Sequence, residues 1–378
     1  MSNNTRSNLM RGVRRVVIKV GTSTLTHASG VMNYARMQHL VEDINGIVQR
    51  GVESVLVSSG AVGAGVGRLK LKDKPKTIPE KQAAAAVGQG ILIHAYERLF
   101  EKFNLVVAQV LLTRADIASR IRYLNARNTL TTLLKYGVVP VVNENDTVAV
   151  EEIQVGDNDR LSALVACLVD SDLLVILTDT EGVYTRDPRM FSDAQLISVY
   201  SDSGNEPEFC AGGAGSRFGT GGMNTKLEAA RIVTNSGIPM VVANGSRDGV
   251  LQSILSGDEI GTLFMPSQHR LHTKKRWIGF GSSPAGKIHV DEGAARAIVT
   301  AGKSLLPSGV TRTEGSFAVG HVVSVIEPEM REIARGIVNY TAGEVELIKG
   351  KHSDEIEEVL GYRACPEVIH RDNLTVTV

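Results

Sequence analysis

The chain has 378 residues, 43% hydrophobic and 22% charged, which is enough for two or three globular domains. Its 41 basic and 41 acidic residues balance, so its charge gives no indication of a nucleic-acid partner. The three cysteines (Cys167, Cys210, Cys365) and the nine histidines show no disulfide or metal-ligand spacing, and no metal site is predicted. Without a membrane-length apolar run or a signal-peptide pattern, we expect a cytoplasmic protein.

Strand-length apolar runs alternate with helical segments along the first two thirds of the chain. The predicted strands are 16–20, 54–57, 105–112, 138–142, 173–177 and 240–242. The predicted helices are 34–50, 79–103, 121–136, 161–169 and 225–236. We expect Asn33 to cap the first helix and Gly51 to stop it. Because the strands are apolar throughout, the pattern predicts an α/β fold whose mostly parallel sheet has helices on both faces.

The pattern changes after about Leu263. Residues 266–283 indicate a linker, and 284–366 contain short segments with turn signals, typical of a small β-rich domain, with one clear helix over 291–301. The remaining expected boundaries are an N-terminal extension over 1–13, the α/β domain over 14–265 and a C-terminal tail over 367–378. Ligands in open α/β sheets bind beyond the carboxyl ends of strands, which is where the glycine-rich and acidic segments lie.

Two glycine-containing segments follow the first two predicted strands. In the first, Lys19 precedes Gly21 and two hydroxyl residues, a combination that suits a phosphate because glycine lets backbone N–H groups approach. A strand-end lysine in solvent is the alternative. The second, SSGAVGAG (58–65), turns from a strand into a helix and could hold a carboxylate or phosphate. Close packing of a helix on the sheet would also require small residues here.

Two acidic segments are hard to explain as parts of a core. NEND (143–146) directly follows a buried strand, and Asp146 could hold an ammonium group. In VGDND (155–159), Asp157 or Asp159 could orient lysines or contact phosphate-bound Mg²⁺ through water. The alternative for this second segment is a cap for the helix that follows. Both can hold, because three residues offer more oxygens than one cap uses.

The last two candidate segments also follow strands or precede a helix. Thr178 and Asp179 follow the strand 173–177, and a turn is the alternative for them. GTGGMNTK (219–226) runs into a helix with Lys226 in its first turn. A cation there opposes the helix dipole, and a bound phosphate would remove the conflict. A solvated surface lysine is the alternative.

Together, in this order, these segments resemble the amino-acid kinase family. The segments that carry the resemblance are VIKVGTS (17–23), SSGAVGAG (58–65), LLTRAD (111–116), LNARNTL (124–130), PVVNENDTVA (140–149), VGDNDRLSAL (155–164), LTDTEGVYTRDPR (177–189) and GTGGMNTK (219–226). The C-terminal part resembles a PUA domain through KKRWIGFG (274–281), DEGAARAI (291–298) and SLLPSGV (304–310). Each segment alone is weak, but the ensemble is specific and spans nearly the whole chain.

The resemblance implies ATP-dependent phosphorylation of the side-chain carboxylate of L-glutamate, the first step of proline biosynthesis, with Mg²⁺. It implies catalytic roles for Lys19 and Lys226, which flank the transferring phosphoryl group, and for Asp159 with Asp157, which hold those lysines. The implied glutamate-binding residues are Ser59, Asn143, Asp146 and Asn158. The implied ATP-binding residues are Lys19, Thr178, Asp179, Thr220, Gly221, Gly222, Met223, Asn224, Thr225 and Lys226.

The resemblance also implies partners and leaves alternatives. It implies proline as a feedback inhibitor, a homo-oligomer (dimer or tetramer), and a glutamyl phosphate reductase that could receive a labile product. A kinase of the same family acting on N-acetylglutamate, aspartate, UMP or carbamate is one alternative. An RNA-binding protein acting through the PUA-like domain is another, and the neutral charge of that domain argues against it. A catalytically inactive α/β protein is a third, which the presence of both lysines and the acidic cluster argues against.

Overall fold

The computed structural model describes residues 3–27, 31–71, 73, 75–148, 158–188, 190–200, 222–266, 278–279 and 282–377. The chain forms two compact units. The first comprises Met1–Ile117 and Ile121–Arg270, and the second comprises Leu271–Val378 with Ala118–Arg120. Each unit has its own sheet and its own hydrophobic core, as expected for separate domains.

Among the residues that the structure describes, the centre of the first unit is an eight-stranded sheet in the order β3-β4-β2-β1-β5-β7-β8-β6. Its strands are β1 (Arg15–Val20), β2 (Glu53–Val57), β3 (Val107–Leu112), β4 (Val139–Glu144), β5 (Leu173–Thr178), β6 (Val199–Tyr200), β7 (Met240–Asn244) and β8 (Thr262–Phe264). The strands from β3 to β7 in this order pair in parallel, whereas β8 runs antiparallel to β7. Every residue of β5 is buried. The prediction of a mostly parallel, two-sided sheet is confirmed.

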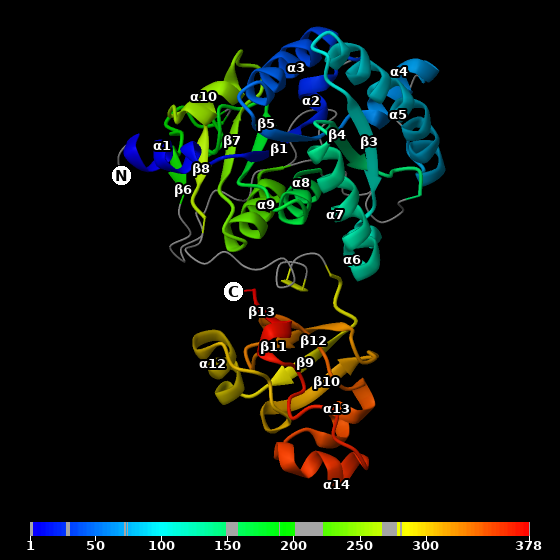
Figure 1. Cartoon of the computed structure of the whole chain (residues 1–378), viewed down its shortest axis with the longest axis vertical. Helices are drawn as coiled ribbons and strands as arrows, with labels where there is room; N and C mark the ends of the chain where they lie inside the picture. The colour runs from blue at the N-terminus through cyan, green and yellow to red at the C-terminus, as the bar shows by residue number, and fades with distance from the viewer. Residues whose placement is uncertain are drawn as a thin grey trace. The chain divides into compact units, whose positions relative to one another are not determined.

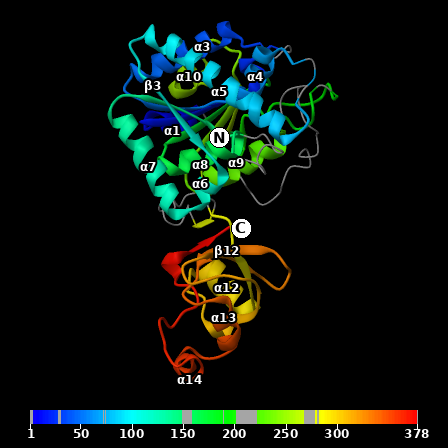
Figure 2. The ribbon, with the colours of Figure 1, turned by 90° about the vertical axis from the view of Figure 1, so that its right-hand side faces the viewer.

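Helices cover both faces of this sheet (Figures 1 and 2). On one face lie α3 (Tyr34–Val48), α5 (Ile78–Glu101) and α10 (Val250–Ser256), and on the other lie α8 (Asn158–Leu168) and α9 (Met223–Asn235). The remaining helices of the unit are α1 (Asn3–Arg11), α2 (Thr22–Leu25), α4 (Ala61–Leu69), α6 (Arg114–Ala118) and α7 (Arg120–Lys135). Helices thus cover the two faces of the sheet, and the carboxyl ends of its strands remain as the place where a ligand can bind.

Local sequence signals set the ends of the two longest helices on the first face. Asn33 caps α3, as predicted, because its side-chain oxygen accepts a hydrogen bond from the backbone N–H of Arg36 at 3.1 Å. Gly51 follows the end of α3 with φ 81°, a left-handed conformation that favours glycine. Thr77 and Glu80 form a reciprocal capping box at the start of α5.

Helices α4 and α5 pack with their backbones in direct contact. A Cβ atom added at Gly65 of α4 would lie 1.8 Å from the carbonyl oxygen of Ala84. One added at Gly88 of α5 would lie 1.7 Å from the carbonyl oxygen of Ala61. The small residues of SSGAVGAG therefore serve close packing of α4 on the helix α5, whereas the sequence pattern indicates close packing between a helix and the sheet. This contact fixes the start of α4 beside the end of β2.

The second unit is built on a five-stranded sheet in the order β10-β9-β11-β12-β13. Its strands are β9 (Gly286–Val290), β10 (Val310–Gly315), β11 (Val322–Ile326), β12 (Glu332–Ile337) and β13 (Leu374–Val376). Its helices are α12 (Glu292–Ala301), α13 (Ala342–Ile348) and α14 (Ile356–Leu360), with short 3-10 turns η4 (Pro307–Gly309), η5 (Ser353–Glu355) and η6 (Arg371–Asn373). The pairs are antiparallel except β9 with β11.

Both ends of the chain pack into the two units, whereas the sequence led us to expect a separate N-terminal extension and a C-terminal tail. In α1, Met10 is buried in the core of the first unit, and the buried Arg6 donates to the carbonyl oxygen of Ile260 at 2.7 Å. At the other end, β13 pairs with β12, and Leu374 belongs to the core of the second unit. The two compact units therefore reach closer to the ends of the chain than the expected boundaries. Among the described residues, no helix has both the length and the apolar character needed to span a bilayer.

We predict that replacing Gly65 or Gly88 with alanine lowers the free energy of unfolding by about 1–3 kcal/mol, because each new methyl group would force α4 and α5 apart. Gly90→Ala on α5 is the matched control. Nothing lies within 4 Å of its added Cβ, so it should raise stability by about 0.5–1 kcal/mol. Urea denaturation of the three variants measures this. Equal stability of Gly65→Ala and Gly90→Ala would contradict the close contact.

Candidate active site

Four neighbouring parallel strands, β4, β2, β1 and β5, end at one edge of the first sheet. The register places Lys19 of β1 opposite Val57 of β2 and Ile176 of β5, so the residues just beyond these strands lie side by side. The polar residues at these ends are Ser58 and Ser59 after β2, Asn143 and Asp146 at and after β4, and Thr178 and Asp179 at and after β5. The sheet thus gathers segments that are up to 160 positions apart in sequence.

A buried carboxylate joins the two predicted catalytic lysines. Asp159, in the first turn of α8, is 0% exposed, and its Oδ1 lies 2.5 Å from the Nζ of Lys19. Its Oδ2 lies 3.2 Å from the Nζ of Lys226 on α9 and accepts a hydrogen bond from the hydroxyl of Thr225 at 3.0 Å. Both lysines are also buried, at 6% and 8% exposure. Strand β1 and helices α8 and α9 therefore converge on one carboxyl group.

The electrostatics of this cluster favour the ionised form of Asp159. Burial by itself would raise the pKa of Asp159, but the two ammonium groups and the hydrogen bonds outweigh it and hold that pKa at about 2. Asp159 is therefore ionised at neutral pH. Because one carboxylate balances two ammonium groups, the cluster keeps a net positive charge in a place with little water. Such a place suits an anionic group.

Beside the lysine cluster, the side chain of Asn158 ties the ends of two strands together. Its Nδ2 lies 2.8 Å from the carbonyl oxygen of Ser58, 2.9 Å from the hydroxyl oxygen of Ser59 and 2.9 Å from the Oδ1 of Asn143. The Oδ1 of Asn158 and the Nδ2 of Asn143 are buried, with no hydrogen-bond partner among the described residues. Buried polar atoms without partners are costly, so these two point to a ligand that would satisfy them.

Asp146 lies just after β4 and differs from Asp159 in its surroundings. It is half-buried and has no ion-pair partner within the described part of the chain. Loss of hydration raises the pKa of its carboxyl group to about 6. A carboxylate in this condition gains from a cation that approaches it, and a ligand ammonium group would supply one.

Three helices begin at this edge of the sheet. Gly60, with φ 98°, precedes the first residue of α4, while α8 begins at Asn158 and α9 follows Gly222. The N-terminal turns of helices carry unpaired backbone N–H groups and partial positive charge. Together with Lys19 and Lys226, they offer hydrogen-bond donors and positive charge that can bind phosphate or carboxylate groups.

Comparison with known proteins agrees with this geometry. A model of the amino acid kinase family matches residues 14–244, and a model of the PUA domain matches residues 286–360. The chain belongs to the amino acid kinase family. It is 57% identical over 363 residues to a glutamate 5-kinase of Moorella thermoacetica, covering 96% of each chain. It is 52% identical over 369 residues to a glutamate 5-kinase of Carboxydothermus hydrogenoformans, covering 97% of this chain and 99% of the relative.

Of the predicted nucleotide-binding residues, Lys19 lies in β1, and the other described ones lie at the carboxyl end of β5 and at the start of α9. Thr178 is buried, and its hydroxyl donates to Asp179 at 3.1 Å. In α9, the hydroxyl of Thr225 lies 2.7 Å from the carbonyl oxygen of Gly222 and also faces Asp159. The structure thus brings residues 222–226 next to the lysine cluster. Asp157, Thr220 and Gly221, also predicted for the site, lie outside the described residues.

Sequence reasoning missed several residues that support the site from behind. The hydroxyl of Tyr96 in α5 lies 2.9 Å from the hydroxyl of Ser58, and burial raises the pKa of Tyr96 above its usual range. Gln89 of the same helix donates to the carbonyl oxygen of Glu144 at 3.1 Å. In the sequence, both residues fall inside a helical pattern, where a tyrosine and a glutamine give no functional signal. Their polar partners become visible only after α5 is packed against the sheet.

We predict that Asp159→Asn lowers the free energy of unfolding at neutral pH by about 3–5 kcal/mol, because it leaves two buried ammonium groups without a counter-charge. Thr225→Val is the control, because it removes one hydroxyl group beside Asp159 but no charge, and it should cost about 1 kcal/mol. The contribution of Asp159 exists above its unfolded pKa near 4 and is lost as pH falls toward about 2. Denaturation at neutral pH that leaves both variants equally stable would contradict this account.

Proposed function

We propose that this chain transfers the γ-phosphoryl group of ATP to the side-chain carboxylate of L-glutamate, giving L-glutamyl 5-phosphate. The observation that carries the proposal is the pair of buried lysines that bind Asp159 at the carboxyl ends of the strands. The chain also aligns over nearly its full length with proteins named glutamate 5-kinase. The activity would be the first step of proline biosynthesis, and we propose that it takes place in the cytoplasm.

Lys19 and Lys226 are the proposed catalytic residues. Phosphoryl transfer depends on positioning and on neutralising the charge that spreads over the phosphoryl oxygens. The two ammonium groups are held on different oxygens of one carboxylate, so they can neutralise this charge without a change in their own positions. Asp159 acts through the lysines as a positioning residue, and Asp157 is proposed to assist it. A carboxylate acceptor is already ionised at neutral pH, so the reaction needs no general base.

The proposed glutamate site consists of Ser59, Asn143, Asp146 and Asn158. The amide nitrogen of Asn143 can donate to a carboxylate, and the amide oxygen of Asn158 can accept from an ammonium group. Asp146 supplies the charge that an α-ammonium group requires. The starting N–H groups of α4 add donors for the second carboxylate of the substrate. Every charged part of glutamate thus has a complementary group at this edge of the sheet.

The proposed nucleotide site consists of Lys19, Thr178, Asp179 and residues 220–226. The N-terminal turn of α9 offers backbone N–H groups, and Lys226 in that turn opposes the helix dipole until an anion arrives. Among the described residues, no group of three acidic, cysteine or histidine side chains could enclose a metal ion. The described residues therefore do not form a magnesium cage, and we propose that Mg²⁺ enters on the ATP phosphates.

The remaining expectations concern regulation and partners. Feedback inhibition by proline, a dimer or tetramer, and transfer of the product to a glutamyl phosphate reductase belong to this proposal as consequences of the family. Phosphorylation of N-acetylglutamate, aspartate or UMP, and RNA binding by the PUA domain, are alternatives that no contact in the described structure favours.

The test is to incubate the purified protein with ATP, Mg²⁺, hydroxylamine and one acceptor at a time: L-glutamate, aspartate, N-acetylglutamate or UMP. An acyl phosphate yields a coloured hydroxamate, and ADP release serves as the common readout. The proposal expects hydroxamate with glutamate alone. ADP release with a different acceptor would mean that the protein is a kinase that acts on another substrate. No ADP with any of the four would overturn the proposal.

The raised pKa of Asp146 predicts a pH dependence of glutamate binding. Because its carboxyl group becomes protonated below about pH 6, the KM for glutamate should rise as pH falls through that value, approaching about tenfold per unit. Asp159 stays ionised in the same range, so kcat at saturating glutamate should change much less.

The control is Asp146→Asn, whose KM should be high and independent of pH between about 7 and 5. Steady-state kinetics at saturating ATP measure both proteins. A wild-type KM that stays constant over this range would show that Asp146 does not bind the ammonium group.

A further inference from the structure

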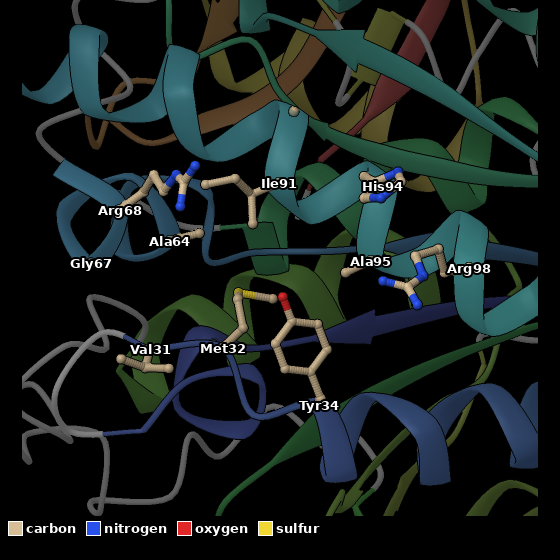
Figure 3. Close-up of a pocket in the computed structure, with 11 residues that line it drawn as sticks. Val31, Met32, Tyr34, Ala64, Gly67, Arg68, Ile91, His94, Ala95 and Arg98 are labelled. Atoms are coloured by element: carbon tan, nitrogen blue, oxygen red, sulfur yellow. The ribbon is translucent and has the colours of Figure 1, made fainter.

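A cavity of about 480 Å³ lies in the kinase unit between α4, α5 and residues 31–34 (Figure 3). Its volume is within the range typical of small-molecule sites. The cavity is separate from the proposed substrate site, because none of Ser59, Asn143 or Asn158 lines it. None of Lys19, Asp146, Asp159 or Lys226 lines it.

The lining is cationic at its ends and apolar between them. Arg68 of α4 and Arg98 of α5 point into the cavity from opposite sides, and the hydroxyl end of Tyr34 rises between them. Met32 and Ile91 supply apolar surface. No acidic residue lines the cavity, and neither arginine has an ion-pair or hydrogen-bond partner among the described residues. A guanidinium group binds carboxylate or phosphate through two parallel hydrogen bonds, so this lining suits an oxyanion with an apolar portion.

All three walls of the cavity continue into the active site, and α4 does so at its start, which follows Ser59 and Gly60. In α5, Ala95 lines the cavity, while the hydroxyl of its neighbour Tyr96 forms a hydrogen bond with the hydroxyl of Ser58. The carbonyl oxygen of Ser58 in turn accepts a hydrogen bond from the side-chain amide of Asn158. In the same helix, Gly90 lines the cavity, while its neighbour Gln89 bonds to the end of β4.

The third wall, residues 31–34, is tied to α2, which starts three residues after Lys19. Met32 pairs with Thr26 in a β-bridge, and the backbone N–H of Asn33 donates to Leu25 at 2.7 Å. Helices α4 and α5 are held together by their backbone contact, and residues 31–34 lead from α2 into α3, which packs against α5. An occupant that contacts both α5 and residues 31–34 would therefore touch elements that are joined to Ser58, to the end of β4 and to α2.

We infer that this cavity is an effector site for a small oxyanion, carboxylate or phosphate, that carries an apolar group. Arg68 and Arg98 bind its charge, Met32 and Ile91 contact its apolar part, and its binding changes the KM for glutamate. By linkage, glutamate changes the affinity for the oxyanion by the same factor.

The first test titrates the full-length protein with 4-fluorobenzoate, 4-fluorophenyl phosphate and neutral 4-fluorobenzamide, followed by fluorine NMR. At least one anion should bind with a Kd on the order of 1 mM, and the amide should not bind. Arg68→Gln and Arg98→Gln should each weaken binding about tenfold, whereas Arg50→Gln, on an exposed arginine outside the cavity, should not. Which anion binds more tightly distinguishes a carboxylate effector from a phosphate effector.

The second test separates the cavity from the active site and measures the effect on activity. Lys226→Met should bind the probe as the wild type does. A saturating probe should change the wild-type KM for glutamate at least about threefold and leave the Arg68→Gln/Arg98→Gln double variant unchanged, because the coupling passes through the bound anion. Loss of probe binding in Lys226→Met, equal binding in the arginine variants, or an unchanged KM in the wild type would each overturn the inference.

Discussion

The kinase unit depends on one carboxylate that is shared by two cations. Asp159 is fully buried, and it is the group that makes it possible for Lys19 and Lys226 to be buried as well. Removing three charges from water is costly, and the cost is recovered only if the ion pairs have good geometry. The cluster therefore forces β1, α8 and α9 into fixed relative positions. Two buried ammonium groups share one carboxylate, so the cluster carries a net positive charge away from water. A phosphoryl-transfer site requires such a charge.

The fold supplies the frame in which this cluster can form. Parallel pairing brings the carboxyl ends of β4, β2, β1 and β5 to one edge, and three helices start there. The glycine contact between α4 and α5 places α5 close enough for Tyr96 to reach Ser58 and for Gln89 to reach the end of β4. The groups around the substrate are thus held by hydrogen bonds from a second layer, and precise placement of this kind is worth large factors in rate.

Much of this architecture could be predicted because local and long-range preferences agree. The runs 16–20 and 173–177 are apolar and rich in β-branched or leucine residues, and they became the two central strands β1 and β5. The cap at Asn33 and the stop at Gly51 are local, so they were visible in the sequence. The site segments were recognisable because each follows a predicted strand or precedes a predicted helix, and because their order resembles that of a known family.

The parts that could not be predicted depend on tertiary packing. Helix α1 is polar along most of its length, and only its contacts with the rest of the unit reveal that Arg6 and Met10 are buried. Strand β13 is three residues long, too short to give a periodic signal, and exists because β12 offers it an edge. The pairing of Tyr96 with Ser58 and the cavity between Arg68 and Arg98 join residues 30 or more positions apart. No pattern within one segment contains that information.

The measurement that tests the central claim most directly is the steady-state kinetics of Lys226→Ala with glutamate and ATP, beside the exposed-lysine control Lys102→Ala. If the shared carboxylate holds Lys226 to stabilise charge in the transition state, kcat and kcat/KM for glutamate fall by the same large factor and KM is unchanged. Lys102→Ala should match the wild type. A rise in the KM for glutamate with kcat unchanged would contradict the account, because Lys226 would then bind the substrate without taking part in phosphoryl transfer.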